Sequence, residues 1–581
     1  MLMIDAVQNH VRSVFSHAMR VVAPGGKSQL RGKRGQHLAG TLLRLNLASL
    51  AGLFACLTLC LLSTPATASA TTYNVVSNCG ATGNGSTDDT AAINTCIGRL
   101  QAGDTLLFPQ GTYKITSSLV IDVANVTVDG SSNTATIRAA FSGNMLLFGN
   151  PNGFCVGCSL GPSVSLAFTA GELSPAFTTS TSLGVNAGDY IYIHQGGQDY
   201  STDTCVGGGS PPCQGHPTNC DVSGCRGEVL QVQSVSGNQI IVTTALHDTY
   251  DLSLNAAVAQ KLQNPLAGIT LKNITLDGAS TAAMPLAFYG VVNSTVSGVT
   301  ITGANDPPSS GSYTLFANVT YGLNLNNVTL TSTAANLAQL GISEFGNLSI
   351  HGMTISGASG GSALFSSGAN GSVVDLTVDG TLGTFRPFKT TATRYTTFGS
   401  LTVKNGTSYY NGLSIEYYSS HNKFNSCLVT NNGTSGAGTG NAGINLFGNY
   451  NQFNTFNNCT VSGNGNIAFY VSSSDALLLA RDLYNTISGG SFSGDSNGES
   501  VIEIEGGGTL ITGATLNGPA GTNYYGIHLD SHQTYACVNN NTFTANAFPS
   551  GAIHVDNGYH DLGSGNNLNG QGSNLQSGTC P

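Results

Sequence analysis

The sequence predicts an all-β chain built as a right-handed parallel β-helix, and three observations support this. A short pattern, apolar-Thr-apolar-x-Gly, recurs, and from Thr275 to Thr402 consecutive threonines are 25, 29, 25, 23 and 25 residues apart. The repeats are β-branched runs separated by Gly and Asn turns, and no window shows an apolar stripe at the helical period. Such a period indicates a solenoid whose neighbouring coils lie about 4.8 Å apart. The repeats are NVTVDG (125–130), NITLDG (273–278), GVTITG (298–303), NVTLTS (327–332), GMTISG (352–357), DLTVDG (375–380), SLTVKNG (400–406), NCTVSG (458–463) and GATLNG (513–518).

The first segment, residues 1–70, is expected to be a secretory signal. It holds basic residues, then the apolar run LNLASLAGLFACLTLCLL (45–62), then an Ala-x-Ala site ending at Ala70. This order is typical of exported chains. A transmembrane anchor is the alternative, but it needs about 20 apolar residues. We therefore expect a secreted protein, extracellular or periplasmic, with no membrane attachment after cleavage.

The charge of the remaining chain limits its partners. The first 70 residues hold 7 of the 19 basic and 1 of the 29 acidic residues, which leaves 12 and 28 and a net charge of −16. This balance argues against nucleic acid and anionic membranes as partners. The sequence does not indicate an oligomeric state.

Twelve cysteines remain after the signal, an even number that favours disulfides in an exported chain. Zinc is the alternative for the four that crowd into one short stretch, but their spacings lack paired C-x2-C. These four are Cys205, Cys213, Cys220 and Cys225.

The regular repeats are interrupted between residues 155 and 250. Here AGDYIYIHQ (187–195) and GEVLQVQSVSGNQIIVTTAL (227–246) alternate apolar and polar residues, with Ser-Gly-Asn as a hairpin turn. We expect residues 71–154 to form a cap and the first coils, 155–250 an inserted cysteine-rich antiparallel β module, and 251–581 the rest of the β-helix.

The segment YNVVSNCGATGNGSTDDTAAINTCIGRLQAGDTLLFPQGTYKIT (73–116) contains a glycine-rich turn, two adjacent aspartates, an amphipathic run and F-P-x-G-x-Y. It resembles the N-terminal signature of the pectate lyase-like and polygalacturonase-like β-helix superfamily, with Asn84 where the family usually has Asp. The resemblance implies that Asp88 and Asp89 are structural. They begin a helix to about Leu100 whose apolar face covers the open end of the β-helix. Cys79 and Cys96 are placed to join this cap by a disulfide.

Strand alternation predicts a row of outward side chains on successive coils. Glu503, Glu505 and Asp530 could meet the spacing of glycosidase carboxyl pairs, with His528 orienting one of them. Phe447, Tyr418 and Tyr470 would bind substrate, and a solvated acidic face is the alternative. The expected row is Glu416, Phe447, Tyr470, Glu505, Asp530 and Asp556.

A second, basic constellation lies in FRPFKTTATR (385–394). Arg386 and Lys389 would act on a uronate beside Glu416, with Arg394 binding the substrate, as lyase chemistry requires. Acidic side chains would hold Ca²⁺ if the chain is a lyase. No other metal or cofactor is indicated, and a solvated basic loop is the alternative.

The motifs leave the activity open between classes. The polygalacturonase set N-T-D, G-H-G and R-I-K does not occur, and the pectate lyase R-x-P-x-x-R pattern is only partly matched by Arg386-Pro387-Phe388-Lys389. The leading hypothesis is a polysaccharide-degrading enzyme, a glycoside hydrolase or a polysaccharide lyase, acting on pectin-like or other acidic glycan. The alternative is a non-catalytic β-helix that binds glycans or serves as a surface adhesin.

Overall fold

The computed structural model divides the chain into two compact units, and the division falls between Ser69 and Ala70. The expected signal segment lies outside the described residues except at its end. No described helix is long and apolar enough to cross a membrane. The described residues are 69–149, 160–195, 226–253, 256–281, 284–304, 313–331, 338–357, 363–380, 387–406, 411–433, 442–447, 450–471, 484–494, 500–505, 507–518, 524–530, 536–556 and 561–578.

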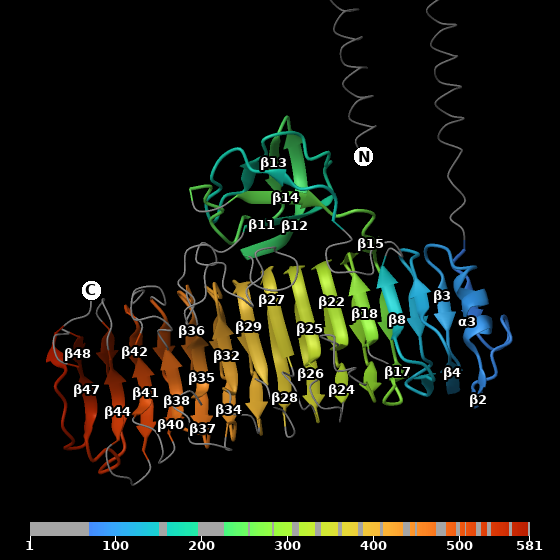
Figure 1. Cartoon of the computed structure of the whole chain (residues 1–581). Helices are drawn as coiled ribbons and strands as arrows, with labels where there is room; N and C mark the ends of the chain where they lie inside the picture. Colours follow the sequence, from blue (N-terminus) through green and yellow to red (C-terminus); the bar gives the residue numbers. More distant parts are fainter. Residues whose placement is uncertain are drawn as a thin grey trace, which may run out of the picture. The chain divides into compact units, whose positions relative to one another are not determined.

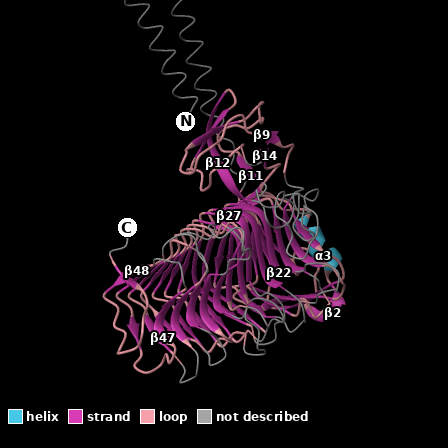
Figure 2. Ribbon diagram, turned by 60° about the vertical axis from the view of Figure 1, so that its left-hand side comes forward, coloured by secondary structure: helices cyan, strands magenta, loops and turns pink. Residues whose placement is uncertain are grey.

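The second unit is the expected right-handed parallel β-helix, in which short strands of successive coils pair in register along three ladders (Figure 1). Figure 2 shows the coils stacked one behind another, with the helix α3 at the N-terminal end. The first ladder consists of β1 (Thr72–Asn74), β3 (Thr105–Leu107), β6 (Thr127–Asp129), β16 (Thr270–Lys272), β20 (Thr295–Ser297), β23 (Asn324–Asn326), β26 (Ser349–Ser356), β28 (Ser372–Asp379), β30 (Thr397–Gly399), β33 (Lys423–Asn425), β36 (Thr455–Asn457), β39 (Thr486–Ser488), β42 (Leu510–Thr512), β45 (Cys537–Asn539), β48 (Leu562–Ser564) and β49 (Gln576–Ser577).

The second ladder contains the repeat threonines, which pair in register from Thr275 through to Thr402. The residue after each threonine points inward and is fully buried, as Leu276 and Val403 illustrate. The repeat therefore marks one position of every coil. This ladder consists of β2 (Asn84–Asp88), β4 (Gly111–Ile115), β7 (Ala135–Ala139), β17 (Ile274–Asp277), β21 (Thr300–Thr302), β24 (Thr329–Thr331), the second halves of β26 and β28, β31 (Thr402–Lys404), β34 (Leu428–Thr430), β37 (Thr460–Ser462), β40 (Ser491–Ser493), β43 (Thr515–Asn517) and β46 (Thr542–Phe543).

The third ladder has the longest strands and carries the candidate residues on its outer face. It consists of β5 (Leu119–Ile121), β8 (Asn144–Gly149), β18 (Met284–Tyr289), β22 (Tyr313–Tyr321), β25 (Ala338–Gly346), β27 (Ala363–Ala369), β29 (Phe388–Arg394), β32 (Leu413–Glu416), β35 (Ala442–Phe447), β38 (Ile467–Val471), β41 (Ser500–Ile504), β44 (Tyr525–Leu529) and β47 (Gly551–Val555), with β15 (Leu266–Ala267) and β19 (Val291–Val292) beside it.

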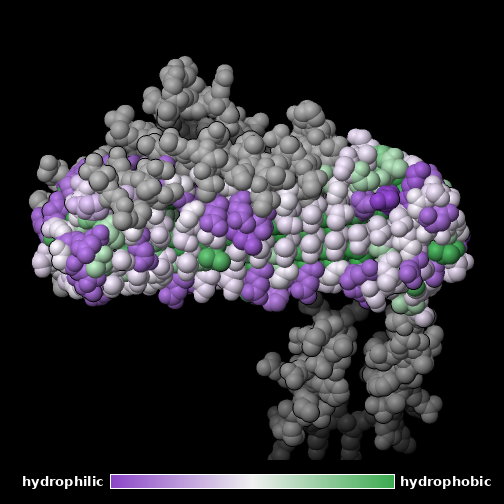
Figure 3. Space-filling model, turned by 90° about the horizontal axis from the view of Figure 1, so that it is seen from below, coloured by the Kyte–Doolittle hydropathy of each residue, from purple (hydrophilic) through white to green (hydrophobic). Residues whose placement is uncertain are grey.

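Stacked asparagines satisfy the polar groups of the turns. The buried Asn422 side chain donates to Asn454 Oδ1 at 3.1 Å, and Asn454 donates to Asn485 Oδ1 at 3.2 Å. Because each amide is hydrogen-bonded to the next coil, the turns bury polar atoms without leaving them unpaired. The surface is correspondingly poor in charge, and residues of intermediate hydropathy predominate on the face seen in Figure 3.

The helix α3 (Thr90–Ile97) covers the N-terminal end of the core through Ile93, Cys96 and Ile97. The two aspartates before it are structural, as the resemblance implied. Asp88 Oδ1 accepts the Thr90 N–H at 3.0 Å, which satisfies a free donor of the first turn. The buried Asp89 carboxylate accepts the N–H groups of Thr82 and Gly83 at 2.6 and 3.1 Å, and so holds the glycine-rich turn.

Two disulfides join described residues. Cys79–Cys96 fastens the cap, as expected. Cys427–Cys459 links two neighbouring coils and was not expected. Its signal is the repeat itself, because each of these cysteines directly precedes residues that pair in register, Leu428 and Thr460. The cysteines at 205, 213, 220 and 225 lie outside the described residues.

The inserted module is an antiparallel six-stranded sheet in the order β10-β13-β12-β11-β14-β9. The expected hairpin joins β12 to β13 through Gly237, whose φ is +61°. The sheet continues beyond residue 250 to β14, and a bridge between Leu160 and Leu262 closes the module at its base. Its strands are β9 (Val164–Ser165), β10 (Ala176–Thr178), β11 (Tyr190–Gln195), β12 (Arg226–Ser236), β13 (Gln239–Val242) and β14 (Ala257–Lys261).

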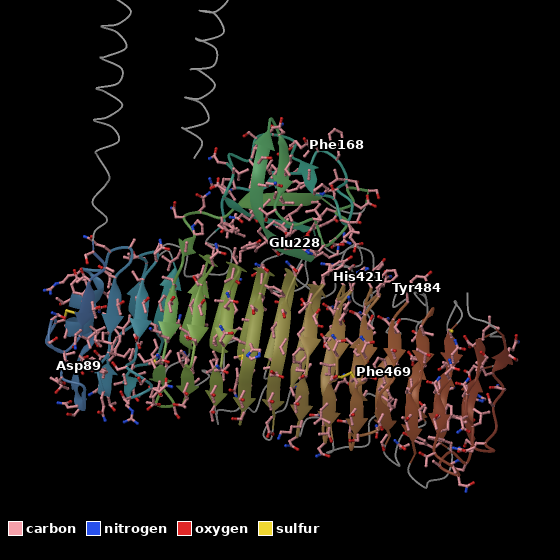
Figure 4. The ribbon with its side chains drawn as sticks, turned by 180° about the vertical axis from the view of Figure 1, so that it is seen from behind. Asp89, Phe168, Glu228, His421, Phe469 and Tyr484 are labelled. Atoms are coloured by element: carbon pink, nitrogen blue, oxygen red, sulfur yellow. A yellow bond between two sulfur atoms is a disulfide. The ribbon has the colours of Figure 1, made fainter. Side chains whose placement is uncertain are left out.

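The module contacts the outer face of the third ladder. Its Tyr192 and Val229 share one buried apolar cluster with Val319 and Tyr321 of β22. Figure 4 shows Glu228 of β12 on the side of the module that faces the coils. The module is therefore attached to the middle of the β-helix by a buried contact surface.

Candidate functional site

The outer face of the third ladder carries two rows of side chains from β29 onward. Tyr470 pairs with Asn445 and Glu503, so it does not follow Phe447 in the row that alternation predicted. The prediction was wrong here because β35 continues beyond the residue that pairs with Tyr470, and strand ends do not fix register. The first row is Lys389, Ser414, Asn445, Tyr470, Glu503, His528 and His554. The second holds Glu416 and Phe447, which pair with each other, and then Glu505, Asp530 and Asp556.

On the last coils these rows form a carboxylate–histidine cluster. Carboxylate oxygens of Glu503, Glu505 and Asp530 all lie within 4.8 Å of one another. The structure therefore brings together three residues that the sequence placed in one site. The cluster consists of Tyr470, Glu503, Glu505, His528, Asp530, His554 and Asp556.

Hydrogen bonds order the cluster. Tyr470 donates its O–H to Glu505 Oε1 at 2.6 Å. Burial and the nearby Glu505 charge raise the pKa of Tyr470 well above its ordinary value, so it remains a donor. His528 Nε2 and His554 Nε2 lie 3.1 and 3.4 Å from the same oxygen, Oδ1 of Asp556.

Burial opposes the charge of Asp556, but the hydrogen bonds from Asp530 and His528 outweigh it and lower its pKa. The cluster thus crowds several carboxyl groups together, an arrangement that general acid–base chemistry can use.

Two separate groups of three residues within the cluster could each hold a metal ion. Glu503, Glu505 and Asp530 offer the oxygen ligands that Ca²⁺ prefers. His528, His554 and Asp556 offer a mixed nitrogen and oxygen set, which suits transition metals better.

The basic constellation is only partly placed. Arg386 lies outside the described residues. Lys389 Nζ contacts Glu416 Oε2 at 2.6 Å, and Ser414 donates to Glu416 Oε1 at 2.8 Å. The Glu416 side chain is 1% exposed, whereas Lys389 is 31% exposed. Lys389 and Glu416 therefore form an ion pair several coils away from the carboxylate–histidine cluster.

Two expected substrate-binding residues are buried. Arg394 Nη2 lies 3.1 Å from Asp248 Oδ2 of the module, and its side chain is 4% exposed, so in this arrangement it does not face solvent. Tyr418 is also buried, whereas Tyr417 contacts Phe447 edge to face at 5.8 Å on the outer side. The alternation ends here because both tyrosines have positive φ, 26° and 60°.

The contact between module and coils contains buried charges that the sequence did not reveal. Glu228 accepts the Tyr250 O–H at 3.2 Å and contacts His247 Nδ1 at 2.6 Å. Asp248 lies between Arg394 and Arg226, 3.5 Å from Arg226 Nη1. All of them but Arg394 belong to the module, so only the docking of the module brings Arg394 and Asp248 together.

Comparison with known proteins gives a family match at the N-terminal end of the described β-helix. Residues 72–167 match the family model described as "Rhamnogalacturonase A/epimerase, pectate lyase-like". Over these residues the chain is similar to pectate lyase-like proteins. A search of curated protein sequences gives no significant match.

Solved structures that are similar to this chain have diverse names. The tailspike protein gp49 from Pseudomonas phage LKA1 is 15% identical with a TM-score of 0.57, over 86% of this chain and 82% of that one. The mannuronan C-5 epimerase AlgE6 A-module from Azotobacter vinelandii is 12% identical, with a TM-score of 0.47 and coverage of 88% and 100%. PfbA, a surface adhesin of Streptococcus pneumoniae, is 10% identical, with a TM-score of 0.38 and coverage of 85% and 91%. At such identities the similarity establishes the fold alone.

Proposed function

We propose that this chain is a secreted polysaccharide-degrading enzyme, a glycoside hydrolase that acts at the carboxylate–histidine cluster. The observation that carries the proposal is the geometry of Glu503, Glu505 and Asp530, whose carboxylate oxygens lie within 4.8 Å of one another. Glycoside hydrolysis needs one carboxylic acid and one carboxylate on either side of the scissile bond. The Cys79–Cys96 and Cys427–Cys459 disulfides favour an exported protein, because such bonds persist in oxidising compartments.

In the proposed reaction Asp530 gives its proton to the glycosidic oxygen as the bond to the anomeric carbon breaks. Glu503 attacks that carbon, and water then releases the sugar while its proton returns to Asp530. The carboxylate oxygens lie within 4.8 Å, closer to the spacing of about 5–5.5 Å in retaining enzymes than to the 6.5–9.5 Å of inverting ones. The Tyr470 hydroxyl would hold Glu505, and the two histidines would hold Asp556.

Hydrolysis fits the described residues better than elimination. A lyase or epimerase must neutralise a uronate carboxylate with a cation. Strand β29 provides two cations, and both are ion-paired: Lys389 with Glu416 and Arg394 with Asp248. A lyase at this cluster would therefore depend on Ca²⁺ held by its carboxylates.

The test is the activity of Asp530→Asn and Glu503→Gln on a panel of neutral and acidic polysaccharides. New reducing ends report hydrolysis, and ultraviolet absorbance of the unsaturated product reports elimination. We expect hydrolysis with retained anomeric configuration, unaffected by EDTA, and a loss of at least a hundredfold in each variant. Asp122→Asn, an exposed carboxylate on the third ladder far from the cluster, is the matched control.

Three outcomes would contradict the proposal. Elimination abolished by EDTA would indicate a lyase. Full activity in Asp530→Asn would remove the cluster from the reaction. Glycan binding without any cleavage would favour the adhesin or binding protein.

A further inference from the structure

Four aromatic rings stack on successive coils where the third-ladder strands end; we name this set the aromatic ladder. It consists of Tyr395, His421, Phe453 and Tyr484. Their ring centroids are 4.6, 4.8 and 5.3 Å apart, and the interplanar angles are 2°, 23° and 14°. The rings therefore repeat once per coil in nearly parallel planes. Figure 4 shows His421 and Tyr484 along one edge of the β-helix.

These rings occupy a backbone position that aromatic residues do not favour. All four residues have φ between 49° and 60°, in the left-handed region. The preceding coils place Asn347 and Asn370 at this turn, and Gly508 follows Tyr484. The left-handed region costs an ordinary residue about 1–2 kcal/mol, so asparagine or glycine would be less strained at all four sites. The conformation of the turn therefore does not explain why aromatic residues occur here, and the explanation must lie in what their side chains contact.

Ring stacking explains only part of this choice, because exposure increases along the ladder. The His421 side chain is 28% exposed, whereas Phe453 is 43% and Tyr484 is 51% exposed. The centroid spacing exceeds the contact distance of two carbon layers, about 3.5–4.0 Å, so the rings are offset like steps. Phe453 and Tyr484, the two C-terminal rings of the ladder, thus offer a stepped apolar surface in a chain that has no tryptophan.

The ladder lies next to the carboxylate–histidine cluster. Phe453 belongs to the coil of Phe447, and Tyr484 belongs to the coil of Tyr470. Tyr470 is the member of the cluster nearest the ladder along the rows, and its hydroxyl contacts Glu505. A linear polymer lying along this edge of the third ladder would contact both the rings and the carboxylates.

The charge beside the ladder selects the polymer. Tyr395 donates its O–H to Glu172 of the module, and His421 Nε2 lies 3.7 Å from the same carboxylate. Arg394, the cation next to Tyr395, is ion-paired with Asp248. An anionic sugar at this end would meet a carboxylate, whereas the apolar face of an uncharged pyranose would not.

We propose that the aromatic ladder is a binding site for an uncharged polysaccharide, whose successive sugar rings lie on Phe453 and Tyr484. The inference rests on the proposed function, because it places substrate subsites beside the hydrolytic cluster. It also replaces the acidic glycan that the sequence suggested with a neutral one. The once-per-coil spacing of the rings suits an extended chain that presents one sugar per step.

The test is affinity electrophoresis of the full chain in native gels that contain hydroxyethyl cellulose, glucomannan or polygalacturonate. We expect a neutral polymer to retard the wild type and polygalacturonate not to do so. Phe453→Ala and Tyr484→Ala should each weaken binding about tenfold, and the double variant about a hundredfold. Phe168→Ala removes an equally apolar ring that is 69% exposed on the module, and it should bind as the wild type does.

Circular dichroism and thermal unfolding of each variant confirm that it is folded. Unchanged retardation of the double variant, or retardation only by polygalacturonate or by no polymer, would overturn the inference. A change in sedimentation coefficient on Phe453→Ala would mean that the ladder contacts a second copy instead. Asp530→Asn separates the two proposals, because it should abolish hydrolysis and keep the retardation; if it still hydrolyses, the proposed function fails and the binding result stands.

Discussion

We expect the attachment of the module to depend strongly on Asp248, which lies between the buried Arg394 and the partly buried Arg226. Its oxygens are 3.1 Å from Arg394 Nη2 and 3.5 Å from Arg226 Nη1. At an effective dielectric constant of about 20, each attraction is about 5 kcal/mol before desolvation is subtracted. Asp248→Asn leaves two buried cations facing each other, and we expect a loss of about 3–5 kcal/mol. Arg394→Met leaves Asp248 paired with Arg226, so we expect a smaller loss of about 1.5–3 kcal/mol.

Hydrogen exchange measures these losses locally. The amides of β12 and β29 should exchange faster in Asp248→Asn than in Arg394→Met, while those of β43 remain as protected as in the wild type. Asp379→Asn is the control, because its ion pair with Lys404 is partly exposed and should be worth at most about 1 kcal/mol. Equal protection in the two test variants, or a larger effect of Arg394→Met, would refute the central role of Asp248.

Three further predictions concern pH, the coil disulfide and the cap. Burial lowers the pKa of His421 below its ordinary 6.5, so the stability that the neutral imidazole contributes is complete above pH 6.5 and is lost as the pH falls through the lowered pKa. We therefore expect His421→Phe to reduce the fall in Tm between about pH 7.5 and about pH 5.5. An unchanged fall in Tm would contradict this prediction. Replacing both Cys427 and Cys459 by Ser should cost about 3–4 kcal/mol from the 32-residue separation, measured by urea unfolding, and a loss below about 1 kcal/mol would count against it. Asp89→Ala leaves the Thr82 and Gly83 N–H groups without their acceptor and should speed their hydrogen exchange while hydrolysis continues; loss of hydrolysis in a folded protein would show that the aspartate is more than structural.

The sequence predicted most of what depends on local period and little of what depends on docking. The repeat threonines, the hairpin around Gly237 and the Cys79–Cys96 cap follow from spacing and turn chemistry, which are local. Alternation also placed Glu503, Glu505 and Asp530 on one face, as the structure has them. Whether these residues are catalytic remains a prediction.

The errors share a physical cause, which is that backbone irregularity and long-range burial leave no periodic signal. The left-handed Tyr417 and Tyr418 end the strand alternation, and a tyrosine carries no mark of positive φ. Tyr418 is buried because Arg226 of the module lies over its ring. Arg394 looked free for an anionic substrate because its partner, Asp248, belongs to a separate sheet. The row of Tyr470 was displaced because β35 continues to Phe447, beyond Asn445, the residue that pairs with Tyr470.

The bridge between Leu160 and Leu262 has a consequence for how the β-helix forms. The coil of β8 pairs directly with that of β18, although the whole module separates them in the chain. If the 101 residues between Leu160 and Leu262 were a flexible loop, bringing its ends together would cost about 4 kcal/mol in chain entropy. A module that folds first holds its own two ends together and meets that cost within its own sheet. The coils on either side can then pair as though they were consecutive, so folding of the insertion sets the point at which the first coils join the rest of the solenoid.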